Sequence, residues 1–320
     1  MSTKQTSLAA KRARRPLRVR QFLALSLAAV MVPTIGGCSG IGRGQKLVTP
    51  ELAELANEDI DLARAAAENT NRLIDPAFVG KTTVVQDPWG FESARLFFKQ
   101  SHTLFVAENS DAAKLRAASI AVSQRAPMVV YDDSVRNDIY RLAEDVGANL
   151  IVTVGKVPFA DAFYPGEERQ HQVVRDPGNT KALGEYTAFG FSSKVVIDPS
   201  RMVEEVAALD SDEKIELKAA WEPLPQQISH KKMPAIPGSA RRDGQMSPNI
   251  VATSQSPIAN VVNANAYGGT VLIMTDPDPS ATKVGAAMVA GLEEGPVVAL
   301  GPEFGSAKEF SAKISRGWTE

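Results

Sequence analysis

The chain has 320 residues, a formal net charge of −2 and a single cysteine, Cys38. One cysteine excludes an intramolecular disulfide, so the core alone must hold the fold. The roughly 280 residues that follow Cys38 can bury such a core as one large domain or as two smaller ones.

The first 37 residues have the composition of an export signal. Residues 1–20 hold seven Lys and Arg and no acidic residue, and the stretch from Phe22 to Gly36 is apolar and uncharged. That stretch has the length of a signal-peptide core and is shorter than the ~20 residues of a membrane-spanning helix. A mitochondrial transit peptide would instead be amphipathic. We therefore predict a signal peptide over 1–37, and the Arg14-Arg15 pair leaves twin-arginine export open beside the general route.

The lone cysteine ends this segment in the sequence Ile35-Gly36-Gly37-Cys38. An aliphatic residue and two small residues before a cysteine resemble a bacterial lipobox. The resemblance implies that Cys38 is lipidated and becomes the mature N-terminus, with a lipid such as palmitate anchoring the protein to the extracytoplasmic face of the cell membrane. The alternative is an ordinary buried cysteine.

Removing the signal changes the charge of the protein. Without those seven basic residues, 28 Lys and Arg remain of the 35, against 37 Asp and Glu, which gives the mature body a net charge of −9. Proteins that bind nucleic acid neutralise phosphates with clustered Lys and Arg. An acidic body therefore argues against nucleic acid as a partner.

The segment after the cysteine predicts a flexible tether over 38–48 and then a first α/β module over 49–221. The module begins with a helix from Thr49-Pro50 to Arg72, because proline is favoured at the first helical position. Short runs that are apolar on both faces then alternate with stretches of helical period, which is typical of a parallel sheet covered by helices. The predicted strands are 83–85, 103–107, 127–131 and 149–154.

The rest of the first module is less regular. Residues 156–193 form an irregular excursion, residues 194–198 a further strand, and residues 200–221 one helix or two. Five prolines in 222–248 then predict a linker and a domain boundary. A second α/β module follows over 249–320, with predicted strands at 249–253, 268–276 and 295–301.

The two modules share one order of features. Each has a strand ending in small or polar residues, a strand ending in aspartate (Asp132, Asp276) and a strand ending in glycine (Gly155, Gly301). The alternative is that any parallel α/β protein repeats units of this length. We predict an α/β fold of parallel sheets flanked by helices, with two related βαβαβ modules.

The first module also resembles a known family over Phe91 to Pro158. The matching features are the helix start Phe91-Glu92-Ser93-Ala94, the strand end Val106-Ala107, the alanine-rich helix 111–124, Ala126-Pro127 before the next strand, and the closing Gly155. This order resembles the type 2 cell-wall-binding repeat of Gram-positive surface proteins, and 249–310 matches it more weakly. The resemblance implies small α/β modules that hold a protein to cell-envelope polymers.

Candidate binding residues follow the predicted strands. Asp132, Asp133 and Gly155 in the first module, and Asp276, Asp278 and Gly301 in the second, lie at the carboxyl edge of a parallel sheet, where open α/β folds bind ligands. Paired carboxylates there could act as acid and base on a glycan or hold a divalent cation. Aspartate after a strand is also a common helix cap, with Asp133-Ser134 and Asp278-Pro279 as the helix starts, which is the interpretation we favour.

The sequence offers little other chemistry. His102, His171 and His230 are too far apart for a zinc spacing, and neither a phosphate loop nor a nucleophile elbow occurs. We therefore predict no metal, no cofactor and no catalytic residue. The leading hypothesis is a lipid-anchored protein that binds or scaffolds cell-wall components. The alternatives are the solute-binding lipoprotein of a transporter and an envelope-glycan hydrolase that uses Asp132 or Asp276.

Overall fold

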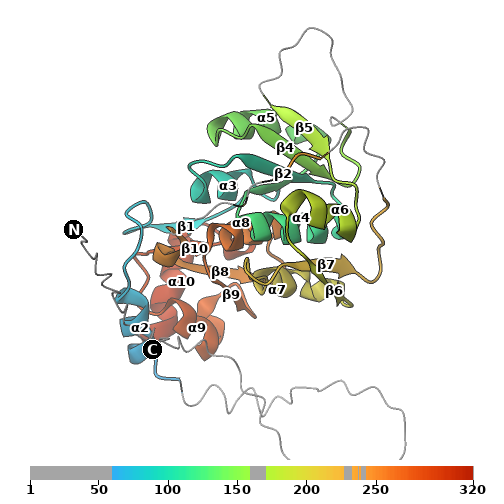
Figure 1. The fold of residues 1–320 in the computed structure, drawn as a ribbon. Helices are drawn as coiled ribbons and strands as arrows, with labels where there is room; N and C mark the ends of the chain where they lie inside the picture. Colours follow the sequence, from blue (N-terminus) through green and yellow to red (C-terminus); the bar gives the residue numbers. More distant parts are fainter. Residues whose placement is uncertain (1–59, 159–170, 227–232, 237, 239–242, 320) are drawn as a thin grey trace, which may run out of the picture. The chain divides into compact units, whose positions relative to one another are not determined.

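A computed structural model describes residues 60–158, 171–226, 233–236, 238 and 243–319 (Figure 1). The predicted signal peptide, Cys38, the tether, the first part of the predicted helix 50–72 and most of 227–242 lie outside these residues. Among the described residues, all strand pairs are parallel and helices cover the sheets, which confirms the predicted α/β class.

The first sheet has the strand order β3-β2-β4-β5. Its strands β2, β3 and β4 are buried along their whole length, as apolar runs in a parallel sheet should be. The elements of this module are α3 (Phe91–Phe97), β2 (Thr103–Ala107), α4 (Asp111–Gln124), β3 (Met128–Val130), η1 (Asp133–Val135), α5 (Arg136–Asp145), β4 (Leu150–Val154), β5 (Gln172–Arg175) and α6 (Thr180–Thr187).

The second sheet has the order β9-β8-β10-β1, so each of its strands has a counterpart at the same position in the first sheet. Its elements are η4 (Asp243–Met246), β8 (Asn249–Thr253), α8 (Ile258–Tyr267), β9 (Val271–Met274), η5 (Pro279–Ala281), α9 (Lys283–Val289), β10 (Val297–Ala299), η6 (Pro302–Phe304) and α10 (Ala307–Thr319). The helix α2 (Leu62–Thr70) packs beside α9.

One strand belongs to a sheet other than the one that chain order predicted. The sequence predicts that the run TVV at 83–85 is a strand of the first module. In the structure, β1 (Thr82–Val84) instead pairs with β10 of the second sheet, with Val84 opposite Ala299. The first sheet receives its fourth strand, β5, from within the irregular excursion, where no strand was predicted. In both sheets the fourth strand therefore comes from chain outside the compact βαβαβ run.

The segment after α6 is a third, smaller unit. Strand β6 (Ser192–Val196) leads through η3 (Pro199–Arg201) and α7 (Met202–Ala207) to β7 (Ile215–Ala219), which pairs with β6 in parallel. The prediction of helix throughout 200–221 is wrong for its second half. The stretch IELKA is rich in helix formers, yet its hydrogen bonds with β6 and its packing on α4 outweigh that local propensity.

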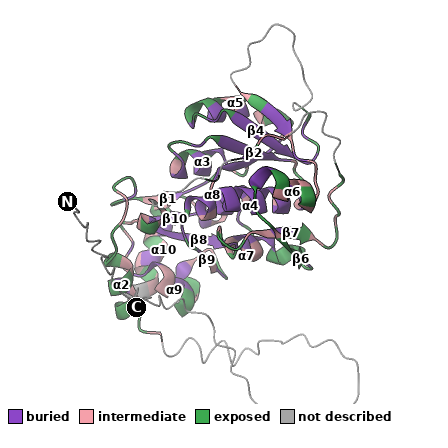
Figure 2. Cartoon of the chain, in the orientation of Figure 1, coloured by how far each residue is buried: buried purple, intermediate pink, exposed green. Residues whose placement is uncertain are grey.

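The helices α4 and α8 join the three units. They pack against each other, and α4 also contacts β2 and β7, while α8 contacts α3 and α7. Nearly every residue of α4 is buried, and Figure 2 shows that β2 and β4 are buried as well. A single hydrophobic cluster runs from Phe78 to Leu300, so residues before and after the predicted linker share one core.

Asparagine side chains on α8 fix these contacts. Asn263 is fully buried, donates to the carbonyl oxygens of Gly90 and Met128 and accepts the Met128 N–H at 2.7 Å. Asn265 donates to the carbonyls of Val206 and Leu209 at the end of α7. Each amide bonds to backbone groups of another unit, which specifies how the units dock.

Candidate functional site

The carboxyl edge of the first sheet is where the predicted residues Asp132, Asp133 and Gly155 lie. Gly155 follows β4 with φ +81°, and a Cβ placed there would lie 2.4 Å from Oε2 of Glu108. The same Glu108 oxygen accepts the N–H of Lys156 at 2.8 Å. The glutamate after β2 therefore covers the glycine after β4 and bonds to the backbone beyond it.

Asp132 acts as a helix cap, one residue before the predicted helix start Asp133-Ser134. Its Oδ1 accepts the backbone N–H of Ser134 at 2.9 Å and the Ser134 hydroxyl, at the start of η1. Both bonds lower the pKa of Asp132, and the bond from the Ser134 hydroxyl lowers it more than the bond from the Ser134 N–H. The carboxylate is therefore held in its ionised form. A depressed pKa suits a cap and does not suit a general acid.

Asp133 is exposed and accepts the hydroxyl of Tyr131 at 2.7 Å. Burial, and then this bond to a carboxylate, raise the pKa of Tyr131 to about 12. The two neighbouring aspartates therefore bind different partners, and each has an identified structural contact.

The carboxyl edge of the second sheet has the same outline. Gly301 follows β10, and a Cβ placed there would lie 2.0 Å from Oε2 of Glu303. The other oxygen of Glu303 accepts the Thr253 hydroxyl at 2.8 Å and that of Ser256. A glutamate carboxylate again lies over the glycine, but here it comes from the loop after the third strand of the module.

Asp276 and Asp278 form a short chain of turns. Asp276 accepts the N–H of Asp278 at 2.8 Å, and Asp278 accepts the Ser280 N–H at 3.0 Å and the Ser280 hydroxyl at 2.6 Å. Burial favours a higher pKa for Asp278, but the bonds from Ser280, with help from Arg316, lower it. Arg316 Nη2 lies 3.2 Å from its Oδ2.

The capping arrangement occurs a third time, in the small unit. Asp198 accepts both the N–H and the hydroxyl of Ser200 at the start of η3, as Asp132 and Asp278 do in their modules. An Asp-x-Ser sequence thus begins the helical connection after β3, β6 and β9. Because the motif recurs once in each unit with the same bonds, its aspartates belong to the fold of the units.

A buried group of paired charged side chains around Arg116 was not among the predicted residues. Arg116 of α4 is 2 % exposed and pairs with Asp176, at 2.5 Å from Nε to Oδ2, and with Glu216 of β7. Tyr186 donates to Asp176 at 2.8 Å and Thr180 donates to Glu216 at 2.6 Å. Burial is the largest single influence on the pKa of Arg116 and lowers it, but the bond to Asp176 and the charges around the guanidinium together outweigh burial, so the pKa is raised. Burial and Asp176 raise the pKa of Tyr186.

This cluster, which we call the Arg116 cluster (Arg116, Asp176, Tyr186, Glu216), ties α4 to β5, α6 and β7. A signal for part of it exists in the sequence. Val-Val-x-Asp-Pro occurs at 84–88, 173–177 and 195–199, so it ends both fourth strands and also β6, with the aspartates Asp87, Asp176 and Asp198 after these strands.

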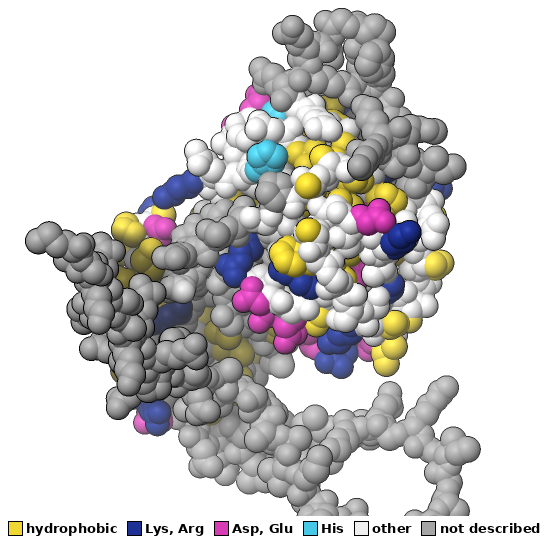
Figure 3. All heavy atoms as spheres, in the orientation of Figure 1, with side chains coloured by type: hydrophobic (Ala, Val, Ile, Leu, Met, Phe, Trp, Pro, Cys, Tyr) yellow, Lys and Arg dark blue, Asp and Glu magenta, His cyan; other side chains and the backbone are white. Residues whose placement is uncertain are grey.

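The described residues contain no group of three or more His, Cys, Asp or Glu side chains that could hold a metal ion. In the same part of the chain, no helix is both long and apolar enough to cross a membrane. The face in Figure 3 carries acidic and basic side chains side by side, with apolar side chains among them.

Comparisons with known proteins give little more. No family model matches the chain, and no curated protein matches it. A solved structure, Cwp6 from Clostridium difficile, aligns at a TM-score of 0.47 with 12 % identity over 72 % of this chain and 47 % of that one. This chain therefore spans about half the length of that protein, and at this TM-score the likeness carries no argument about function.

Proposed function

We propose that the chain is an extracytoplasmic lipoprotein, tethered to the cell membrane through Cys38, whose α/β body binds or scaffolds cell-envelope components without catalysis. The observation that carries the proposal is the sequence Ile35-Gly36-Gly37-Cys38 at the end of an uncharged apolar stretch preceded by basic residues. An exported, acidic body needs no disulfide if its core is large, and the hydrophobic cluster here extends through all three units.

The contacts of the body favour binding or scaffolding over the two alternatives. A solute-binding protein closes two lobes over a ligand, whereas here α4 and α8 pack together inside one continuous core. A glycan hydrolase of this chain would use Asp132 or Asp276, and both carboxylates take part in cap or turn hydrogen bonds. Asp132 accepts from Ser134, and Asp276 accepts the N–H of Asp278.

Replacing the cysteine tests the anchor. In Cys38→Ala the lipid acceptor is lost, so we expect the protein as an unprocessed precursor or in the medium, and no longer as a mature form in the membrane fraction. Ser39→Ala is the matched control, because it changes the adjacent residue and leaves the thiol. A Cys38→Ala protein of mature size in the membrane fraction would exclude the tether.

Envelope binding is tested separately, with the full chain. We expect it to co-sediment with purified insoluble cell walls, and we expect a panel of small solutes to leave its melting temperature unchanged. A thermal shift of several degrees with a sugar, amino acid or peptide, without wall binding, would replace the proposal by the solute-binding alternative.

A further inference from the structure

The turn between α2 and β1 presents an apolar surface to solvent. Leu73 is 79 % exposed and Val79 is 58 % exposed. Single apolar residues on a surface need no explanation, whereas a continuous exposed run is typical of an interaction surface. We call this segment the apolar turn (Leu73 to Gly80), because all of its exposed residues are apolar or glycine: Leu73, Pro76, Ala77, Val79 and Gly80.

Backbone and core contacts hold the apolar turn in place. Asp75, its one charged residue, donates its N–H to Met246 O at 2.8 Å, and its Oδ1 accepts the Ala77 N–H at 2.8 Å. Phe78 is buried, and its ring centroid lies 6.0 Å from that of Phe97. The turn is therefore fixed to the body from inside, and its carboxylate is used within the turn.

A basic residue stands at each end of the apolar turn. Arg72 donates to Ser247 O at 3.1 Å and Lys81 Nζ donates to Ala77 O at 2.9 Å, and neither belongs to an ion pair among the described residues. Burial lowers the pKa of Arg72. Because the acidic pair 293–294 precedes β10, which is the partner of β1, the charge near the turn is mixed. Its apolar tip is therefore what distinguishes this surface, and the two cations suit headgroup phosphates beside it.

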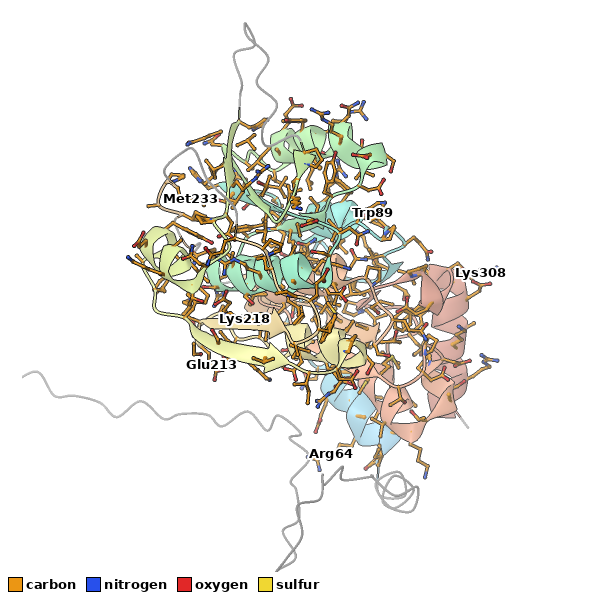
Figure 4. All side chains as sticks on the ribbon, turned by 90° about the vertical axis from the view of Figure 1, so that its right-hand side faces the viewer. Arg64, Trp89, Glu213, Lys218, Met233 and Lys308 are labelled. Atoms are coloured by element: carbon orange, nitrogen blue, oxygen red, sulfur yellow. The ribbon has the colours of Figure 1, made fainter. Side chains whose placement is uncertain are left out.

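The proposed tether joins the body close to this turn. The predicted flexible segment after Cys38 spans about 17 Å on average, and the predicted helix from Thr49 adds about 20 Å before α2 begins at Leu62. The helix α2 spans about 14 Å more and ends just before the turn. Figures 1 and 4 both show α2, on which Figure 4 labels Arg64, at the lower edge of the described body. The turn therefore lies within about 50 Å of the lipid.

We propose that the apolar turn rests in the headgroup layer of the bilayer that carries the lipid anchor. The inference rests on the proposed function, since the tether is what brings the turn to that bilayer. A short tether makes the contact intramolecular, at an effective concentration of roughly millimolar, so a small apolar area is enough to bind. Two attachments, the lipid and the turn, orient the body with α2 toward the membrane. The strand β6, on the other side of the body in Figure 1, then faces away from it.

Fluorescence of the lipidated full chain tests the proposal. The mature protein is reconstituted into vesicles of phosphatidylcholine and phosphatidylglycerol and isolated by flotation. Because Cys38 carries the lipid, one engineered thiol can be labelled with an environment-sensitive dye. A dye at Ala77→Cys should emit at shorter wavelength, and be quenched several-fold more by lipids with a spin label near the headgroup, than a dye at Ile197→Cys. Ile197 is the matched control because it is 82 % exposed and follows β6.

Removing the apolar side chains separates insertion from mere nearness to the bilayer. With the dye at Ala77→Cys, adding Leu73→Ser and Val79→Ser should reduce the quenching to the level at Ile197, whereas adding Val195→Ser and Ile197→Ser should leave it unchanged. These four side chains are all exposed, and circular dichroism checks that each variant is folded. Equal quenching at the two dye positions, or quenching that survives the Leu73 and Val79 changes, would overturn the proposal and leave the tether standing. A protein that does not float with the vesicles would overturn both.

Discussion

The fourth strands of the two larger sheets carry the same short sequence and use it differently. Val-Val-x-Asp-Pro ends both β1 and β5. Asp87, after β1, accepts the backbone N–H groups of Trp89, Phe91 and Glu92 at the start of α3. Asp176, after β5, is fully buried and pairs with Arg116, although it also accepts the N–H of Gly178 at 3.1 Å.

The difference follows from what each aspartate faces. Asp87 is partly exposed next to a helix start, where backbone N–H groups need acceptors. Asp176 faces α4 and the small unit, where Arg116 also meets Glu216. One local motif therefore supplies a cap in one module and half of a buried ion pair in the other, which shows that a repeated sequence does not by itself define a shared ligand site.

The largest expected effect separates these two aspartates. Asp176→Ala leaves Arg116 buried with one carboxylate fewer, and should cost about 3–5 kcal/mol of unfolding free energy. Asp87→Ala removes a cap and should cost about 0.5–2 kcal/mol. Urea denaturation followed by circular dichroism measures both, and equal losses would contradict the distinction.

The next largest effect is the difference in stability cost between alanine substitutions of the glycines at the two carboxyl edges. Gly155→Ala forces a side chain into a backbone with φ +81° and against Glu108, at a cost of about 1–3 kcal/mol. Gly301 has φ 164°, which any residue adopts, so Gly301→Ala need only move the Glu303 carboxylate and its bonds, at about 1 kcal/mol. Melting temperatures of the two variants rank them, and a larger loss for Gly301→Ala would reverse the comparison.

The smallest effect concerns the capping aspartates. Ser134→Ala removes the hydroxyl that lowers the pKa of Asp132, so that pKa should rise toward the ordinary value of about 3.9. Ser280→Ala should likewise raise the pKa of Asp278, although Arg316 still faces that carboxylate and lowers its pKa. Carboxyl carbon chemical shifts followed by NMR from pH 2 to pH 7 measure both values.

The stability that the Asp132 carboxylate contributes changes with pH in a definite direction. Because the folded-state pKa of Asp132 lies below its unfolded value, the stabilisation is present above about pH 4 and is lost as the pH falls through the folded value. The Ser134→Ala protein should therefore lose less stability than wild type on acidification. A steeper acid loss in the variant would contradict this assignment.

Several elements could be predicted because their signals are local. The strands at 103–107 and 249–253 have the predicted bounds, since continuous apolar runs between helical stretches suit buried parallel strands. The sequence also predicts an aspartate cap at Asp278, which is confirmed, and one at Asp133, which the structure places one residue earlier at Asp132; a cap needs only its neighbours within a few residues. The lipidation of Cys38 is a prediction of the same local kind and awaits its test.

Tertiary contacts decided the rest. The sequence by itself determined the α/β class and the basic, apolar and cysteine-containing start of the chain. The structure decided that β1 joins the second sheet, that IELKA is a strand, and that Arg116 meets Asp176 and Glu216 across 60 and 100 residues of chain. Pairing and burial between distant segments are not encoded in local propensity, so only the packed chain reveals them.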